Sequence, residues 1–307
     1  MTEMRLVFLG TGGGMPTTSR GLPATAIRYA GGVMLFDCGE GTQRQFIKSR
    51  LGFKQNFTIF ITHMHGDHVL GLPGLLYTMG MLDREAPVDI YGPRGLAEYL
   101  ETVISHRLGA LTFPVRVHTV SPFLTIERRG LSIRCVPADH VIESYCYVVQ
   151  ERDRPGKMNV EYLEKLGIPR GPLWGRLQRG QSINYGGRII TPEEAVGPRR
   201  RGRKIVYTGD TRPCESIINA AQEADVLIHD STFNDDMVKK AVEDGHSTAR
   251  QAAEVAARAG VKMLYLYHIS PRYEEDAEIL VREARTIFSN AYLAEDLLSY
   301  SIPYPED

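Results

Sequence analysis

The chain has 307 residues, of which 43% are hydrophobic and 24% charged, and its formal net charge is −1 at neutral pH. It can bury a full core in one large domain or two small ones, and its charge balance excludes a general attraction to nucleic acid, so any such partner must be bound by local patches. No stretch has the apolar length of a membrane span, residues 1–9 lack the features of a signal peptide, and the four cysteines lack CxxC spacing, so we expect a cytoplasmic protein with no membrane partner, reduced thiols and no cysteine ligand.

The first predicted elements surround a glycine-rich turn. A strand over residues 4–9 runs into Gly10-Thr-Gly-Gly-Gly14, whose glycines permit a close approach of the backbone to another group. The Gly-x-Gly pattern alone is a weak dinucleotide signal, and no strand with an acidic end supports it at the right distance, so we expect no nucleotide cofactor. A hairpin over residues 24–36 and an amphipathic helix over residues 42–51 follow.

A predicted buried strand over residues 57–61 is followed by a cluster of metal-ligand side chains. His63, His65, Asp67 and His68 follow it directly. Imidazoles and a carboxylate without cysteine suit zinc, with manganese or iron as weaker alternatives. His63 and His65 can point the same way, whereas Asp67 and His68 lie one turn further on, so the segment could serve two ions. The alternative, histidines satisfied in a polar turn, is common for a single histidine but not for four such residues within six positions.

Three later strands end in the same kind of residue. His140, Asp210 and His268 each follow a predicted strand. His140 alone would more often be an ordinary surface or core histidine, and only the repeated pattern of strand ends makes it a candidate ligand. Asp210 is the natural bridge, because a carboxylate can offer one oxygen to each of two ions. These repeated units in both halves of the chain predict a single domain over residues 1–307.

His246 stands at the start of an amphipathic helix predicted to reach residue 259, with Ser247 or Thr248 as its cap. It would lie at a positive helix end, beside a place where an anion could bind. Three further histidines are interpreted as structural: His106, His118 and His229.

Residues 151–182 interrupt the alternation of strands and helices, with three prolines and seven Lys or Arg against four Asp or Glu. We interpret them as an inserted arm. Within it Trp174, Arg176 and Arg179 suit phosphate binding or base stacking, although a mobile surface excursion is an equal alternative. A second basic run over residues 199–204 is interpreted as a solvated loop.

The candidate ligands divide into two sets, which predict two Zn²⁺ per subunit with Mn²⁺ or Fe²⁺ as substitutes. The first ion would be held by His63, His65 and His140, and the second by Asp67, His68 and His268, with Asp210 and a water or hydroxide between them. Two such ions suit in-line displacement at phosphorus. Asp67 could also take the proton of the attacking water. His246 is the best candidate for assisting the leaving oxygen, with Arg272 or a lysine as weaker ones.

On these residues the sequence resembles the metallo-β-lactamase superfamily and, within it, the short form of the ribonuclease Z family. The resemblance extends over nearly the whole chain. One departure is Arg20-Gly21, where family members commonly have Arg-Asn. The motifs are Leu9-Gly-Thr-Gly, Thr62-His-Met-His-Gly-Asp-His68 with its continuation to Leu75, His140, Thr208-Gly-Asp210-Thr, His246-Ser-Thr-Ala249, His268-Ile-Ser-Pro-Arg-Tyr273 and Gly171-Pro.

The resemblance implies an α/β fold, the metallo-β-lactamase αβ/βα four-layer sandwich, in which helices flank two mixed sheets. It further implies an arm that acts as an exosite for tRNA, gripping the elbow of a substrate presented to the partner subunit of a homodimer. The activity implied is a zinc-dependent endoribonuclease that removes the 3′ trailer from precursor tRNA by attack of a metal-bridging hydroxide. The tRNA would keep a 3′-hydroxyl and the trailer a 5′-phosphate.

Two other functions stay open. One is another dinuclear hydrolase on the same scaffold, such as a small-molecule phosphodiesterase or a thioester hydrolase; a remote basic arm argues against it, since a small substrate needs no such grip. The other is a non-catalytic RNA-binding module, in which some of the ligands would be expected to be replaced, whereas all seven positions are filled.

Overall fold

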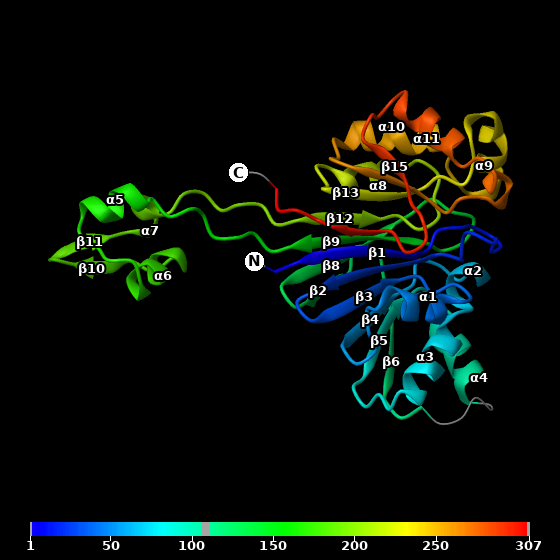
Figure 1. Ribbon diagram of the computed structural model, residues 1–307, viewed down its shortest axis with the longest axis horizontal. Coiled ribbons are helices and arrows are strands. Elements are labelled where there is room, and N and C mark those ends of the chain that lie inside the picture. The colour runs from blue at the N-terminus through cyan, green and yellow to red at the C-terminus, as the bar shows by residue number, and fades with distance from the viewer. Residues whose placement is uncertain (1, 106–110, 306–307) are drawn as a thin grey trace. The chain divides into compact units, whose positions relative to one another are not determined.

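Two β-sheets form the framework of this computed structural model, which describes residues 2–105 and 111–305. Within those residues each sheet has seven strands, and a separate two-stranded hairpin is also present (Figure 1). The first sheet has the order β16-β1-β2-β3-β4-β5-β6, with β1 Met4–Gly10, β2 Ala24–Tyr29, β3 Gly32–Phe36, β4 Asn56–Phe60, β5 Val88–Gly92, β6 Val115–Thr119 and β16 Ser299–Ser301. The second has the order β15-β14-β13-β12-β9-β8-β7, with β7 Thr125–Arg128, β8 Leu131–Pro137, β9 Tyr145–Glu151, β12 Lys204–Tyr207, β13 Val226–Asp230, β14 Leu264–Tyr267 and β15 Ala291–Leu293.

Both sheets are mixed. Strands β3 to β6 pair in parallel and β1 to β3 antiparallel, while β12 to β15 are parallel and β9 pairs antiparallel with β12. Parallel strands end at the same edge of a sheet, so the polar residues that follow β3, β4, β12, β13 and β14 are brought toward one another.

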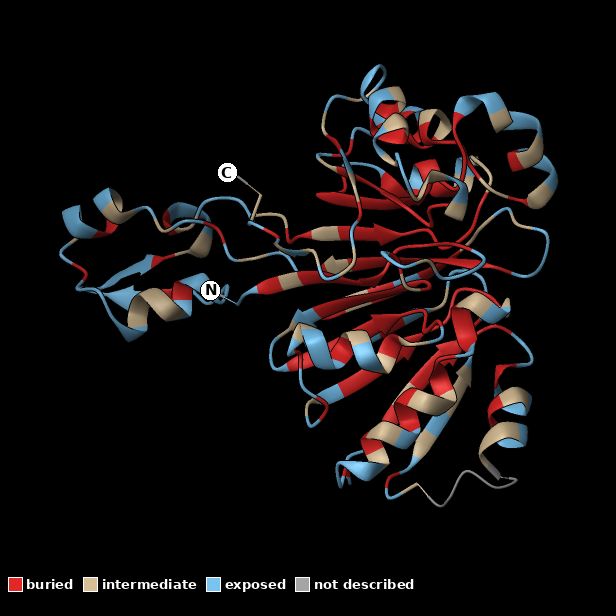
Figure 2. Cartoon of the chain, turned by 45° about the vertical axis from the view of Figure 1, so that its right-hand side comes forward, coloured by how far each residue is buried: buried red, intermediate tan, exposed pale blue. Residues whose placement is uncertain are grey.

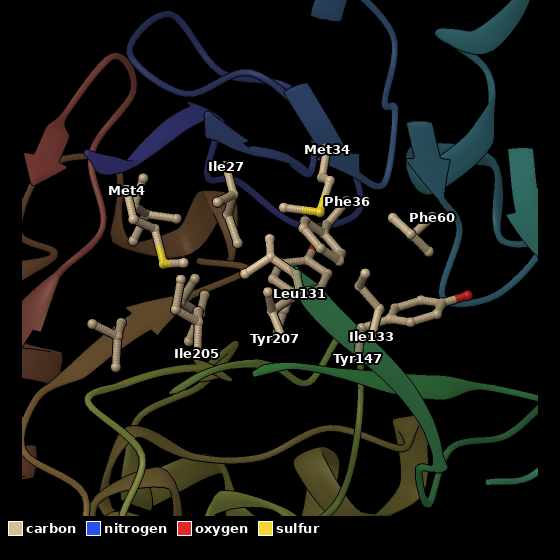
Figure 3. Close-up of a cluster of buried hydrophobic side chains, with 14 of the residues drawn as sticks. Met4, Ile27, Met34, Phe36, Phe60, Leu131, Ile133, Tyr147, Ile205 and Tyr207 are labelled. Carbon is tan, nitrogen blue, oxygen red and sulfur yellow. The ribbon is translucent and has the colours of Figure 1, made fainter. Parts of the chain in front are cut away.

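The main core lies between the two sheets. Figure 3 shows Phe36 and Phe60 from the first sheet facing Tyr147 and Tyr207 from the second. The rings of Phe36 and Phe60 stack at 5.2 Å, and that of Phe60 lies 5.2 Å from Tyr147. Such buried aromatic side chains dominate the apolar area of a core and fix the spacing of the sheets.

Helices cover the outer faces, which gives four layers and confirms the predicted αβ/βα sandwich (Figure 2). No helix of the described part of the chain is both long and apolar enough to cross a membrane. On the first sheet the helices are α1 Thr42–Ser49, α3 Leu72–Met81 and α4 Leu96–Ser105, with the short α2 Gly66–Val69 beside them. On the second they are α8 Glu215–Ala221, α10 Ala249–Ala259 and α11 Glu278–Arg285, with α9 Val238–Asp244 and the 3-10 turns η1 Asp235–Met237 and η2 Pro271–Tyr273 nearby.

Helix α10 begins at Ala249, and its cap is Thr248, one of the two predicted caps. Thr248 accepts a hydrogen bond from the backbone N–H of Gln251, whose side chain bonds back to Thr248 N–H, and these two bonds form a capping box. His246 therefore lies in the preceding loop. Ser247 is buried and donates to the carbonyl of Thr211.

The chain divides into two compact units, and the smaller one comprises Glu151–Arg203 with Tyr304–Asp307, of which residues 306 and 307 are not described. We call it the arm unit. The arm predicted over residues 151–182 falls within it, and the unit continues to Arg203. It has its own small core around Leu163, Leu177 and Ile190. Its elements are α5 Val160–Lys165, α6 Pro172–Gln178, β10 Ile183–Tyr185, β11 Arg188–Ile190 and α7 Pro192–Ala195.

Candidate metal centre

All seven predicted ligands lie at one edge of the sandwich. One group offers four ligand atoms within 4.8 Å of one another, from His63, His65, His140 and Asp210, and a second group offers three, from Asp67, His68 and His268. They come from the loop after β4, the start of α2, and the segments after β8, β12 and β14. The candidate metal groups found among the described residues contain His and Asp alone.

The spacing within each group is that of a coordination shell. His65 Nδ1 lies 3.1 Å from His63 Nε2 and 3.2 Å from His140 Nε2. In the second group, His268 Nε2 lies 3.3 Å from an oxygen of Asp67 and 3.4 Å from His68 Nε2. Ligand atoms bound tetrahedrally at about 2.0–2.1 Å stand about 3.3–3.4 Å apart, so the residues present fit divalent ions such as zinc.

Asp210 connects the two groups. Its Oδ2 lies 3.5 Å from His63 Nε2 and 3.4 Å from His268 Nε2, and its Oδ1 lies 3.4 Å from His68 Nε2. Oδ1 is fully buried and has no hydrogen-bond donor among the described residues. A buried carboxylate oxygen without a donor is costly unless a cation stands beside it, which supports a bridging role between two ions.

Outer hydrogen bonds fix the orientation of the imidazoles. His68 Nδ1–H donates to Asp37 at 2.8 Å, His268 Nδ1–H to Thr232 Oγ1 at 2.8 Å, and His140 Nδ1–H to the Gly245 carbonyl at 2.8 Å. Each of these bonds leaves the Nε2 lone pair directed into the centre. Partners of this kind set the tautomer and the ligand strength of a metal-binding histidine.

Two buried aspartates, Asp37 and Asp230, support the ligands, and the sequence analysis gave them no role. Asp37 accepts hydrogen bonds from Thr62 N–H, His68 Nδ1–H and Tyr207 O–H, each at 2.8 Å. Asp230 accepts from Thr232 Oγ1 at 2.7 Å and from His246 Nδ1–H at 2.8 Å. Asp37 follows β3 and Asp230 ends β13, so the strand-end pattern that identified the ligands could also have found them.

The glycine-rich turn closes one side of the centre. A Cβ at Gly13 would lie 2.3 Å from His268 Cε1, so only glycine lets the backbone lie against that ring. Gly14 N–H donates to Asp67 Oδ2 at 2.8 Å. Arg20, at the departure from the family pattern, is buried and donates to the carbonyl of Ala294, which ties the turn to the end of β15.

Charge is concentrated in this small volume. Burial disfavours the ionised form of Asp210, yet His268, His68 and His63 hold its pKa well below the usual range. Burial likewise opposes protonation of His68, but the carboxylates of Asp210, Asp37 and Asp67 raise its pKa well above the usual value. Three carboxylates thus draw positive charge into the centre, and bound divalent ions would take the place of those protons.

His246 lies beside this centre. Its ring stacks on His268 at 5.1 Å between centroids and stands 5.3 Å from His140. Burial lowers its pKa, but the Asp230 carboxylate outweighs that effect and raises the pKa to about 9. Of the histidines interpreted as structural, His229 is buried with Nδ1 on the Asp230 carbonyl, His118 pairs with Asp89, and His106 lies outside the described residues.

Comparisons with known proteins add independent information. Residues 4–153 match a family described as anti-Pycsar protein Apyc1, and residues 181–269 match a β-lactamase superfamily domain. The chain is 43% identical to a ribonuclease Z of Methanosarcina acetivorans, covering 98% of this chain and 99% of the relative, and 44% identical to one of Archaeoglobus fulgidus with the same coverage. The crystal structure of human tRNase Z, short form, superposes with a TM-score of 0.71 at 30% identity, covering 97% of this chain and 99% of that one.

The carboxylate of Asp37 should set metal affinity without being a ligand. We expect Asp37→Asn to weaken zinc binding by about 10- to 100-fold, because a neutral amide replaces the charged carboxylate that accepts the hydrogen bond from His68 Nδ1–H. Competition with a chromophoric chelator measures the zinc affinity. Asp89→Asn is the matched control, since Asp89 Oδ1 lies 3.0 Å from His118 Nε2 away from the centre. Equal zinc affinities of the two variants would contradict the assignment.

Proposed function

The chain belongs to the ribonuclease Z family of the metallo-β-lactamase superfamily and is a tRNA 3′-processing endonuclease, and on this premise we propose how its residues divide the work. We propose that it cuts precursor tRNA at the 3′ boundary and leaves a 3′-hydroxyl on the tRNA and a 5′-phosphate on the trailer. The observation that carries this proposal is the complete set of seven ligand atoms at coordination-shell spacing.

We assign His63, His65 and His140 to one ion and Asp67, His68 and His268 to the other, with Asp210 shared. Zinc is the metal that this donor set favours, with Mn²⁺ or Fe²⁺ as substitutes. Two bound divalent ions would lower the pKa of an attacking water and neutralise charge on the phosphoryl oxygens. Asp67, held through Oδ2 by Gly14 N–H, is the carboxylate that we assign to receive the proton of that water.

His246 is the residue that we assign to the leaving oxygen. Its Nδ1 is committed to Asp230 at 2.8 Å, which leaves Nε2 as the atom that can donate to ribose O3′. Two rings of the centre, those of His140 and His268, flank the imidazole and fix its plane. Arg272, the weaker candidate, lies with its guanidinium over the ring of Phe233 at 5.7 Å.

We assign tRNA binding to the arm unit because of its charge. The arm unit, residues 151–203 and 304–307, contains twelve Lys or Arg against eight Asp or Glu, a formal charge of +4. The remaining residues contain 24 against 29, a formal charge of −5. A polyanionic substrate is therefore attracted by the arm unit and repelled by the bulk of the chain, which supports an exosite.

We also propose a homodimer, and an apolar face on α1 and α3 supports it. A groove of about 540 Å³ there is lined by Ile47, Tyr77 and Met81, all exposed. Exposed cations, Lys48 and Arg50, lie at the end of α1, and the exposed acids Asp83 and Glu85 follow α3. Two copies related by a twofold axis would bury the apolar side chains of this face against each other.

The main test is cleavage of an end-labelled precursor tRNA beside hydrolysis of bis(p-nitrophenyl) phosphate. We expect one cut at the 3′ boundary, loss of both activities on chelation, and recovery with a divalent ion. In a variant that we call arm-replaced, a two-residue Asn-Gly turn takes the place of residues 152–202. Such a turn can join the two ends because Glu151 N–H donates to the Arg203 carbonyl at 2.8 Å, so the ends already pair. This variant should raise the KM for tRNA on the order of a hundredfold, because the cations that bind the tRNA phosphates are removed.

The replacement should leave ester hydrolysis within about twofold, because the ester has no phosphate remote from the centre for the arm unit to bind. If the intact chain hydrolyses the ester but leaves precursor tRNA whole, the substrate assignment is wrong. If the arm-replaced variant binds tRNA normally, the exosite is wrong while the metal centre stands.

Leaving-group dependence tests His246. In His246→Ala, tRNA cleavage should fall by about 10²- to 10⁴-fold, because ribose O3′ leaves as a strongly basic alkoxide and needs a proton. Hydrolysis of the p-nitrophenyl ester should fall far less, because p-nitrophenolate leaves without protonation. Equal reductions on both substrates would show that His246 supports the centre instead of assisting the leaving oxygen.

A charge on the α1–α3 face tests the dimer. Met81 is 67% exposed, so Met81→Glu should fold normally and yet separate the subunits, since burying the carboxylate at an interface is costly. Mass measured by light scattering during size-exclusion chromatography checks this. Phe123→Glu is the control, because Phe123 is 65% exposed elsewhere on the larger unit. A wild-type protein that is monomeric, or a dimeric Met81→Glu, would refute this interface.

A further inference from the structure

A slit opens between the two sheets at the edge of the sandwich opposite the metal centre. It has a volume of about 230 Å³ and is lined by residues of β2 to β5 and of the β7–β8 hairpin. Strand β4 begins at this slit with Asn56 and Thr58 and ends just before the loop that carries His63. The length of β4 therefore lies between the slit and the metal ligands, and none of the residues assigned to catalysis lines the slit.

The slit exists because smaller and polar side chains replace aromatic ones in one row of the interface between the sheets. Neighbouring residues on β3, β4 and β5 first form a row of three rings, those of Phe36, Phe60 and Tyr91. Two residues earlier on each strand, the neighbours are Met34, Thr58 and Asp89. Both rows face the second sheet, because side chains alternate between the faces of a strand. A hydroxyl and a carboxylate fill less of the space between sheets about 10 Å apart than two rings do, so a void remains.

Thr58 is a buried polar residue that lines this void. It is 8% exposed, and its hydroxyl makes no hydrogen bond within the described part of the chain. Valine has nearly the same shape, so packing alone does not require a hydroxyl here. A largely buried hydroxyl without a partner is costly, and a ligand with a polar edge would satisfy it.

Opposite charges lie side by side in the wall of the slit. Asp89 Oδ2 is 3.4 Å from Arg128 Nη2, and Asp89 Oδ1 is 3.0 Å from His118 Nε2. The Arg128 guanidinium also donates to the Tyr91 hydroxyl and lies over the Tyr91 ring, 5.5 Å from its centroid. These contacts hold a carboxylate acceptor next to guanidinium donors. Both side chains are partly exposed and line the slit, so a molecule inside it can reach them.

A carboxylate beside a guanidinium is complementary to one edge of a guanine ring. That edge carries the O6 acceptor followed by two N–H donors, on N1 and N2. The Asp89 carboxylate can accept both N–H groups at once, and Arg128 can donate to O6. Adenine, cytosine and uracil lack two adjacent donors on this edge. Guanine is therefore the base that this pair of side chains fits best.

Arg129 provides a cation at the exposed rim of the slit. Its Nη1 donates to the Ala30 carbonyl at 3.1 Å. Its side chain also crosses Gly32, where a Cβ would lie 3.3 Å from Arg129 Cδ. A guanidinium held in this way suits a phosphate group. The charged side chains that line the slit are Arg128, Arg129 and Asp89, a formal charge of +1 that favours an anion.

We propose that this slit is a binding site for a guanine mononucleotide. The base would lie in the slit with its edge on Asp89 and Arg128, and the phosphate would lie at the rim beside Arg129. The volume suits one ring system with its sugar and phosphate at the opening, and not a polynucleotide chain. This site is separate from the metal centre, and it does not depend on the function proposed for that centre.

Calorimetric titration of the full chain with zinc bound tests the site directly. We expect guanosine 5′-monophosphate (GMP) to bind saturably, with one molecule per chain, and adenosine 5′-monophosphate (AMP) to bind at least about tenfold more weakly. At concentrations that fill the slit, GMP should leave the KM for bis(p-nitrophenyl) phosphate unchanged, because the slit and the centre lie at opposite edges. Absence of saturable GMP binding, or competition between GMP and the ester, would overturn the proposal.

A switch of base preference tests the role of Asp89. Asp89→Asn should raise the Kd for GMP by about 10- to 100-fold, because an amide cannot accept both N–H groups. The same variant should bind xanthosine 5′-monophosphate more tightly than the wild type does, because xanthine carries a carbonyl in place of the N2 amino group and the amide can donate to it. Glu98→Gln is the control, since Glu98 is exposed on α4, outside the slit, and both affinities should stay unchanged.

Thr58→Val provides a second, nearly isosteric test. Loss of the hydroxyl should raise the Kd for GMP by about three- to tenfold, while the melting temperature without ligand stays close to that of the wild type. If AMP binds as tightly as GMP, or if Asp89→Asn and Thr58→Val both bind GMP like the wild type, the assignment of the slit to a guanine nucleotide is wrong.

Discussion

The carboxylate of Asp37 is the constraint on which the rest of the structure depends. It is fully buried and binds three partners from different elements: Thr62 after β4, His68 in α2 and Tyr207 at the end of β12. Two of these belong to the first sheet and its loops, and the third to the second sheet. One charged group therefore fixes the register of both layers and the orientation of a ligand. A buried charge of this kind is tolerated because hydrogen-bond donors surround it.

The candidate metal ligands are likewise buried polar groups that their neighbours hold in place. Asp210 and Asp67 are held in the ionised state in a largely buried volume, and the histidines around them direct their Nε2 or Nδ1 lone pairs inward. Without a cation this arrangement would leave carboxylates close together at low dielectric. The packed sheets supply the rigidity that holds it, because side chains on strand ends have little freedom. The geometry thus favours metal binding before any substrate arrives.

Sequence reasoning identified the seven candidate ligands that the structure brings together because their signal is local. A strand followed by His, Asp or both is visible in the residues themselves, and parallel strands bring such ends to one edge. Asp37 and Asp230 were overlooked because their roles depend on partners that the chain alone does not place: Asp37 and Tyr207 are 170 positions apart. The pairing of Arg200 with Arg154 could not be foreseen for the same reason, since residues 46 positions apart form that bridge. The sandwich itself was predictable from the family motifs.

The separation of charge explains how a chain of net charge −1 can act on RNA. The residues outside the arm unit carry −5, so the region that holds the metal centre repels a polyanion, and a polyanionic substrate would reach it slowly without the arm unit. In the proposed division of roles, bound divalent ions would offset this repulsion at the phosphate to be cleaved, and the arm unit would offset it by its own positive charge. Affinity and chemistry would then reside in different residues and respond differently to salt. Salt should weaken the attraction between the arm unit and the substrate, because the Debye length is about 8 Å at physiological ionic strength. It should leave the chemistry at the metal centre, where the groups are in direct contact, largely unaffected.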